Sequence, residues 1–210
     1  MTRRTVVLAG PAAWGRGRAA AGLPAGAAVR WVSRAAPAGA EACPPERFHR
    51  ILGTTCDAVV FDAHDGLDPD ALAAAAGSIR GGGLLVLLTP ALADWPGAPD
   101  AALDRLIPAG RGRGEAGARF VERLIGCLRS APGIERYGPE DAPPSLVPGP
   151  PAAAGPEHGY GCRSGDQCNA VEAVVGVVTG HRRRPAVLSA DRGRGKSAAL
   201  GIAAGELLRR

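Results

Sequence analysis

The sequence has almost no lysine, because Lys196 is the only one among 25 basic residues. Aromatic residues are also scarce, at 4% of 210 residues, so a core must be built mainly from Leu, Val, Ile and Ala. The apolar run Leu84 to Leu88 is far too short to cross a bilayer. No N-terminal stretch combines a basic start, an apolar run and a cleavage site. We therefore expect a cytoplasmic protein with no membrane partner.

Cysteine is too sparse and too irregularly spaced to form a disulfide framework. The five cysteines are an odd number, and the separation of Cys162 from Cys168 fits no common zinc site. We expect unpaired and mostly buried thiols. The composition, with 46% hydrophobic and 21% charged residues, is that of a folded chain. The net charge of +5 fits contact with a polyanion but gives only weak support for nucleic-acid binding.

Short β-branched runs separated by turn residues predict a parallel sheet in the first part of the chain. Strands are expected at 5–9, 28–33, 58–61 and 84–88, and their continuous apolar character indicates burial on both faces. Asp68 is placed to cap a helix over 71–80, which Gly81 to Gly83 would end. Strand, helix and strand with short links give the βαβ pattern.

The later part of the chain predicts a second and smaller unit. An amphipathic helix is expected over 115–129, closing an N-terminal domain of residues 1–138. Residues 139–163 are rich in Pro, Gly and Ala and are interpreted as a linker. From 164 to 210 we expect a helix capped by Ser164 or Asp166, a short buried strand at 186–189, a loop and a final helix.

The strongest motif contains the single lysine. Residues 190–197 read Ala-Asp-Arg-Gly-Arg-Gly-Lys-Ser, which fits A-x-x-G-x-G-K-S, a phosphate-binding loop between a strand and a helix. Main-chain amides near Gly193, Gly195 and Ser197 would converge on phosphate oxygens, and the Lys196 ammonium would reach the β- and γ-phosphates. The Ser197 hydroxyl would bind Mg²⁺ held by the nucleotide. The alternative is an arginine-rich turn, since Gly15 to Arg18 is a similar string without Lys-Ser.

Two further candidates are less specific. Gln167 lies 29 residues before Lys196 at the start of the preceding helix, and its amide suits the N6/N7 edge of adenine. Asp62, His64 and Asp65 follow a strand and could form a metal or acid–base site, although Asp65-Gly66 favours a polar turn. Arg182 to Arg184 could contact RNA or form a solvated turn. The glycines after the first strand do not spell a dinucleotide fingerprint, so no NAD site is predicted.

These motifs together resemble the bacterial tRNA(Met) cytidine acetyltransferases. The N-terminal domain of that family is similar in 52–66, Leu-Gly followed by Asp-Ala-Val-Val-Phe-Asp-Ala-His-Asp-Gly, in 81–90 and in Trp95-Pro96. Gln167, the string 180–185 and the loop with 198–201 are similar to the start of the family's helicase-like ATPase module. The expected fold class is therefore α/β, a Rossmann-like parallel-sheet domain followed by the beginning of a P-loop (RecA/helicase-like) NTPase domain.

The resemblance implies an enzyme that forms N4-acetylcytidine at the wobble position of elongator methionine tRNA. Acetyl-CoA would supply the acetyl group, bound by a downstream domain, and hydrolysis of ATP or GTP with Mg²⁺ would support the reaction. The implied nucleotide contacts are Gln167 together with the loop residues Asp191, Arg192, Gly193, Arg194, Gly195, Lys196, Ser197 and Ala198.

The sequence departs from the family after Lys196. It has no Walker B strand, no arginine finger and no acetyltransferase domain, so we expect a truncated or partial chain with no catalytic residue of its own. Two alternatives remain open. One is a fragment of an ATP-dependent helicase or another P-loop NTPase, and the other is an RNA-binding module with a vestigial loop.

Overall fold

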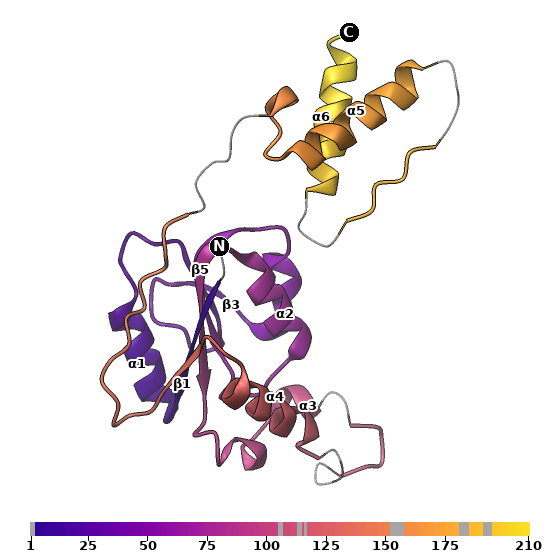
Figure 1. Ribbon diagram of the computed structural model, residues 1–210. Helices are drawn as coiled ribbons and strands as arrows, with labels where there is room; N and C mark the ends of the chain where they lie inside the picture. The colour runs from indigo at the N-terminus through magenta and orange to yellow at the C-terminus, as the bar shows by residue number, and fades with distance from the viewer. Residues whose placement is uncertain are drawn as a thin grey trace. The chain divides into compact units, whose positions relative to one another are not determined.

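The computed structural model describes residues 3–104, 107–112, 115, 117–151, 158–180, 185–190 and 195–210 (Figure 1). The chain divides into two compact units, Met1–Ala152 and Ala153–Arg210. Asp191, Arg192, Gly193 and Arg194 of the predicted loop lie outside the described residues, as do His181 and Arg182 to Arg184.

The first unit is built on a sheet of six strands in the order β3-β2-β4-β5-β1-β6, all parallel. This arrangement confirms the predicted α/β class with a Rossmann-like sheet. The strands are β1 (Arg4–Ala9), β2 (Val29–Val32), β3 (Glu41–Cys43), β4 (Cys56–Asp62), β5 (Ile79–Thr89) and β6 (Ile134–Tyr137). The expected strands correspond to β1, β2, β4 and β5, whereas the short edge strands β3 and β6 were not predicted.

Both faces of the sheet are covered, as continuous apolar strands require. One core contains Val59 and Phe61 of β4 together with residues of α2 (Pro69–Ser78) and α4 (Arg119–Ser130). The other contains Val60 of β4 and Ala19 of α1 (Ala12–Gly22). Figure 1 shows α1 on the side of the sheet opposite α2 and α4.

The predicted helix cap at Asp68 is confirmed. Its carboxylate accepts the main-chain N–H groups of Asp70 and Ala71 at 3.0 and 3.2 Å, which satisfies two donors at the start of α2. The remaining helical turns of this unit are η1 (Pro45–Ile51), η2 (Trp95–Gly97) and α3 (Ala101–Asp104).

Two glycine-rich strings differ from their predicted conformations. Gly81 to Gly83 do not end α2, which stops at Ser78; they lie in β5, where the register against β4 shifts between Cys56 and Ala58. A Cβ on Gly83 would lie 2.5 Å from the Asp57 carbonyl oxygen, so glycine here permits close strand approach. Gly15 to Arg18 form part of α1 and not a turn.

Part of the segment interpreted as a linker packs against the first unit. Leu146 is 1% exposed in the core on the α1 side of the sheet. The Arg4 guanidinium donates to the Ser145 carbonyl at 2.7 Å, and the Gly149 N–H donates to the Gly82 carbonyl at 2.9 Å. The segment 139–151 therefore packs against the first unit and contributes Leu146 to its core.

The second unit contains η4 (Gly159–Gly161) and two longer helices, α5 (Gly165–Thr179) and α6 (Lys196–Leu208). The helices pack side by side around Val171, Val175, Ala199 and Ala203, with Cys162 in the same cluster (Figure 1). The buried strand expected at 186–189 is wrong: residues 185–190 are extended but unpaired, and Val187 is 86% exposed. A strand needs a neighbour for its main-chain groups, and this part of the chain offers none among the described residues.

Candidate nucleotide-binding site

The start of α5 places Gln167 beside the predicted loop. Ser164 caps the helix as expected, because its Oγ accepts the Gln167 N–H at 3.2 Å. The Gln167 Oε1 accepts the Arg163 N–H at 2.8 Å, which fixes the side-chain amide. Its Nε2 then lies next to Gly195, 3.2 Å from the position that a Cβ on that glycine would take. Two residues that lie 28 positions apart in the sequence are therefore in contact.

Gly195 begins α6 in a conformation that suits glycine. Its φ is +83°, in the left-handed region that side chains with a Cβ rarely adopt. The main chain then turns directly into Lys196 and Ser197, the first residues of the helix. The first turn of any helix presents N–H groups that have no acceptor within the helix, and its dipole favours an anion there. Ser197 and Ala198 are both exposed at this end.

The Lys196 side chain reaches back from α6 to the extended segment 185–190. Its Nζ donates to the carbonyl oxygen of Ala190, the first residue of the motif. The half-buried side chain thus spans from the start of α6 to the end of the extended segment 185–190.

These groups line one cavity of about 620 Å³. It brings together Gln167 of α5 and its cap Ser164, Ala190 from the extended segment, and Lys196 of α6 with its cap Gly195. Its size lies in the range of about 300–1,000 Å³ typical of small-molecule sites. Among the described residues, no cluster of three His, Cys, Asp or Glu side chains could hold a metal ion.

The Asp62 cluster is a closed network and not a second cavity. The Asp62 carboxylate accepts from Arg16 Nε at 2.7 Å, Ser33 Oγ at 2.9 Å and His64 Nδ1 at 2.8 Å. It lies at the carboxyl end of β4, and open α/β sheets commonly bind ligands beyond the carboxyl ends of their strands. Here the side chains fill that position themselves.

The contacts of the two His64 ring nitrogens indicate which protonation state of the ring is favoured. Nε2 contacts the Gly10 carbonyl oxygen at 2.9 Å, and Nδ1 contacts the Asp62 carboxylate, so each ring nitrogen faces a group that can only accept. Only a ring that carries hydrogen on both nitrogens can donate to both acceptors, so this arrangement favours the imidazolium form of His64. Burial opposes that charge, but the bonds to Asp62 and Gly10 outweigh it and raise the pKa of His64 above 6.5.

The same hydrogen bonds lower the pKa of the Asp62 carboxyl group. Burial would raise the pKa of Asp62, but hydrogen bonds from His64, Arg16 and Ser33 together lower it to about 2. The sequence found Asp62 and His64 but missed Arg16 and Ser33, because no local pattern connects residues 46 and 29 positions apart. These hydrogen bonds connect the carboxyl ends of β1, β2 and β4 with α1. We therefore interpret the Asp62 cluster as a structural element of the fold.

The remaining predictions concern cysteine and the membrane. All five cysteines are free, and Cys43, Cys56 and Cys162 are buried, as expected. Within the described ranges, no helix is long and apolar enough to span a membrane.

Comparison with known proteins assigns the chain to a family. The two units define an α/β protein with a doubly covered parallel sheet, followed by a helical pair whose Gly-Lys-Ser start lines a cavity. The family model described as "tRNA(Met) cytidine acetyltransferase TmcA, N-terminal" matches residues 1–138. The chain belongs to this family and corresponds to an N-terminal segment of its members.

Several relatives carry the name tRNA(Met) cytidine acetyltransferase TmcA. The protein of Nitrosococcus halophilus is 45% identical over 216 residues, covering 99% of this chain and 29% of the relative. Those of Haloferax volcanii and Haloarcula marismortui are each 39% identical, covering 78% and 77% of this chain and 24% and 22% of the relatives. The chain thus spans less than a third of the length of these proteins.

Proposed function

We propose that this chain is the N-terminal portion of an enzyme that forms N4-acetylcytidine at the wobble position of elongator tRNA(Met). The enzyme would use acetyl-CoA and the hydrolysis of ATP or GTP. This segment supplies an accessory α/β domain and the nucleotide phosphate-binding loop. The observation that carries the proposal is the cavity of about 620 Å³ in which Gln167, Gly195 and Lys196 meet.

The phosphate end of the nucleotide is assigned to the loop and the start of α6. Lys196 would exchange the Ala190 carbonyl for phosphate oxygens, because an ammonium bonds more strongly to an anion than to a neutral carbonyl. The N–H groups of Ser197 and Ala198 in the first helical turn would add main-chain donors. Asp191, Arg192, Gly193 and Arg194 are assigned to the same role from the sequence motif alone.

The base end is assigned to Gln167. Its amide lies against Gly195 and lines the same cavity as Lys196, so one ligand can reach both. A glutamine amide offers a donor and an acceptor, the pair that the adenine N7 and N6 groups need. Contact with a base would require the Oε1 atom to share or release the Arg163 N–H.

Magnesium and acetyl-CoA are proposed from the family membership. The Ser197 hydroxyl is suited to bind Mg²⁺ that is also held by nucleotide phosphates. When bound, the ion would neutralise phosphate charge. Acetyl-CoA is assigned to a part of the family protein that this chain does not cover.

Nucleotide binding tests the proposal directly. ATP·Mg²⁺ is titrated by calorimetry against residues 1–210, against Lys196→Ala and against Arg209→Ala. The last variant removes a positive charge from the far end of α6, where the arginine side chain is 82% exposed. We expect Lys196→Ala to weaken binding about tenfold or more, because it removes a charge-assisted bond, while Arg209→Ala binds like the parent.

Hydrolysis by the whole gene product that carries this segment gives the second measurement. Lys196→Ala should lower NTP turnover by orders of magnitude and leave the circular dichroism spectrum unchanged. Unchanged turnover would refute the role of Lys196. Retained RNA binding with no nucleotide binding by the parent would favour the alternative of an RNA-binding module with a vestigial loop.

A further inference from the structure

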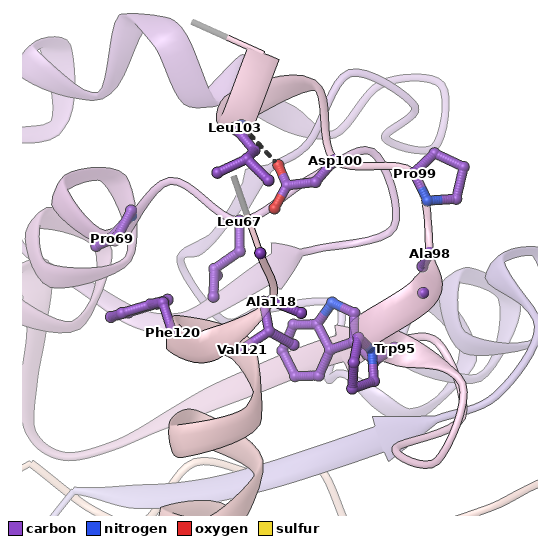
Figure 2. A pocket seen from close by; sticks show the side chains of 13 residues that line it. Leu67, Pro69, Trp95, Ala98, Pro99, Asp100, Leu103, Ala118, Phe120 and Val121 are labelled. Carbon is purple, nitrogen blue, oxygen red and sulfur yellow. Dashed lines mark hydrogen bonds between the residues drawn. The ribbon is translucent and has the colours of Figure 1, made fainter. Parts of the chain in front are cut away.

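A second cavity lies in the first unit, and no residue of the Asp62 network lines it. It has a volume of about 400 Å³ and is lined from three directions: by the loop between β4 and α2, by η2 with the segment after it, and by the start of α4 (Figure 2). The first two of these segments come after the carboxyl ends of β4 and β5. Ligands of open parallel sheets commonly bind beyond those ends.

The lining is aromatic in a chain that has few aromatics. The sequence has three tryptophans and three phenylalanines, and Trp95 and Phe120 both line this cavity. Phe120 is 51% exposed although it is a large apolar side chain. Figure 2 shows Phe120 below Pro69 on one side of the cavity and Trp95 on the other. The walls therefore suit a planar apolar group that can stack.

Asp100 is the charged side chain of this lining. Its Oδ1 accepts the N–H groups of Ala102 and Leu103 at 2.9 and 3.0 Å, the second of which is drawn in Figure 2. Its Oδ2 accepts no hydrogen bond from the described residues. The carboxylate thus offers a fixed acceptor to a ligand that carries an N–H donor.

Exposed cations accompany Phe120 on α4. Arg119 precedes it, and Arg123 comes one helical turn later, in the i,i+3 relation that makes side chains neighbours. Neither arginine makes an ion pair within the part of the chain that the structure describes. Arginines beside an exposed aromatic side chain are the usual components of a single-stranded nucleic-acid surface.

We propose that this cavity binds one unpaired RNA base that carries an exocyclic amino group. The base would stack against Phe120, its amino group would donate to Asp100 Oδ2, and Arg119 and Arg123 would contact the flanking phosphates. Cytosine and adenine present such an amino donor, whereas uracil presents a carbonyl oxygen at the same position. The inference rests on the proposed function for the RNA partner, but it concerns different residues from those that bind the nucleotide.

The test compares two RNA heptamers, all cytidine and all uridine, with residues 1–210. We expect the cytidine oligomer to bind about fivefold or more tighter, and Phe120→Ala to weaken its binding about fivefold to a hundredfold, as for a lost stacking contact. Ultraviolet crosslinking followed by mass spectrometry should place the cytidine adduct on the peptides that contain Trp95 or Phe120. Equal affinity of the two oligomers, or crosslinks only elsewhere, would overturn the proposal.

The variant Asp100→Asn tests base recognition without removing the hydrogen bonds that Asp100 makes within the fold. Asparagine keeps an oxygen to cap Ala102 and Leu103 but places an amide NH₂ where the free carboxylate oxygen lies. The preference for cytidine should then be lost or reversed toward uridine while the protein remains folded. An unchanged preference would count against the assigned contact.

The arginines have a matched control on the same helix. Arg119→Ala with Arg123→Ala should flatten the salt dependence of binding, whereas Arg129→Ala, in the last turn, should leave it unchanged. Lys196→Ala should bind both oligomers like the parent. If the parent chain does not bind ATP·Mg²⁺ but its RNA binding still depends on Phe120, only the nucleotide site is refuted. If the parent binds ATP·Mg²⁺ but its RNA binding does not depend on Phe120, only the present proposal is refuted.

Discussion

Each ring nitrogen of His64 lies beside a hydrogen-bond acceptor. The Asp62 carboxylate and the Gly10 carbonyl both need donors, and only the protonated ring supplies two. Asp62 is in turn held ionised by three donors. A buried pair of this kind contributes little net stability when intact, but it costs several kcal/mol when one partner is removed.

The charged pair predicts a stability maximum in the acidic range. The pKa of His64 is raised above its ordinary 6.5 in the folded chain, so its contribution is complete below pH 6.5 and is lost as pH rises through the folded value. The pKa of Asp62 is lowered from 3.8 to about 2, so its contribution is complete above pH 3.8 and is lost as pH falls toward 2. Urea unfolding between pH 3 and 9 measures both limbs.

Two substitutions check the assignment. His64→Gln should abolish the decline on the alkaline side, whereas His49→Gln, away from the Asp62 network, should keep it. An alkaline decline that persists in His64→Gln would show that another group causes it.

Gly195 is predicted to be irreplaceable for a conformational reason. Alanine there would need a left-handed φ of +83° and would bring its Cβ to 3.2 Å from Gln167 Nε2. We expect Gly195→Ala to lower the free energy of unfolding of the second unit by about 1–2 kcal/mol and to weaken ATP·Mg²⁺ binding. Gly201→Ala, inside α6 with open space around it, should instead stabilise the helix by about 0.5–1 kcal/mol.

At the scale of the secondary-structure elements, pairing with a neighbouring strand determines which residues form a strand, as β5 shows. The run Gly81 to Gly83 looks like a helix stop in the sequence, because glycine commonly ends helices. Pairing with β4 places Gly83 against the Asp57 carbonyl, where no side chain fits. Sequence signals identified β1, β2, β4 and β5, but β3 and β6 have three and four residues and gain their stability from neighbours.

The glycine run gives a matched pair of variants. Gly83→Ala should destabilise the first unit by about 1–3 kcal/mol, because its Cβ would meet main-chain atoms that cannot move freely. Gly81→Ala has open space and an ordinary φ, so it should be tolerated. Chemical denaturation followed by circular dichroism measures the difference, and equal effects would contradict the proposed close approach.

At the scale of the whole molecule, the first unit extends beyond its recognisable sequence. The family model ends at residue 138, but the compact unit continues to Ala152 because Leu146 is buried in its core. Leu146→Ala should therefore lower the free energy of unfolding by about 2–5 kcal/mol. Its neighbour Val147 is 57% exposed, and Val147→Ala should change stability by less than about 0.5 kcal/mol. Similar effects of both substitutions on the urea midpoint would refute the assigned packing.

The sequence alone determined the α/β class, the cap at Asp68, the loop motif and the family, because these depend on local residue order and spacing. For α5 it left Ser164 and Asp166 as alternative caps, and the structure identifies Ser164. The tertiary structure alone decided the contact of Gln167 with Gly195, the ion pair of Arg16 with Asp62, and the cavity between Trp95 and Phe120. It also showed that residues 186–189 are unpaired within the described ranges. Such features join residues far apart in the chain, and their free energy depends on burial and pairing that no local pattern encodes.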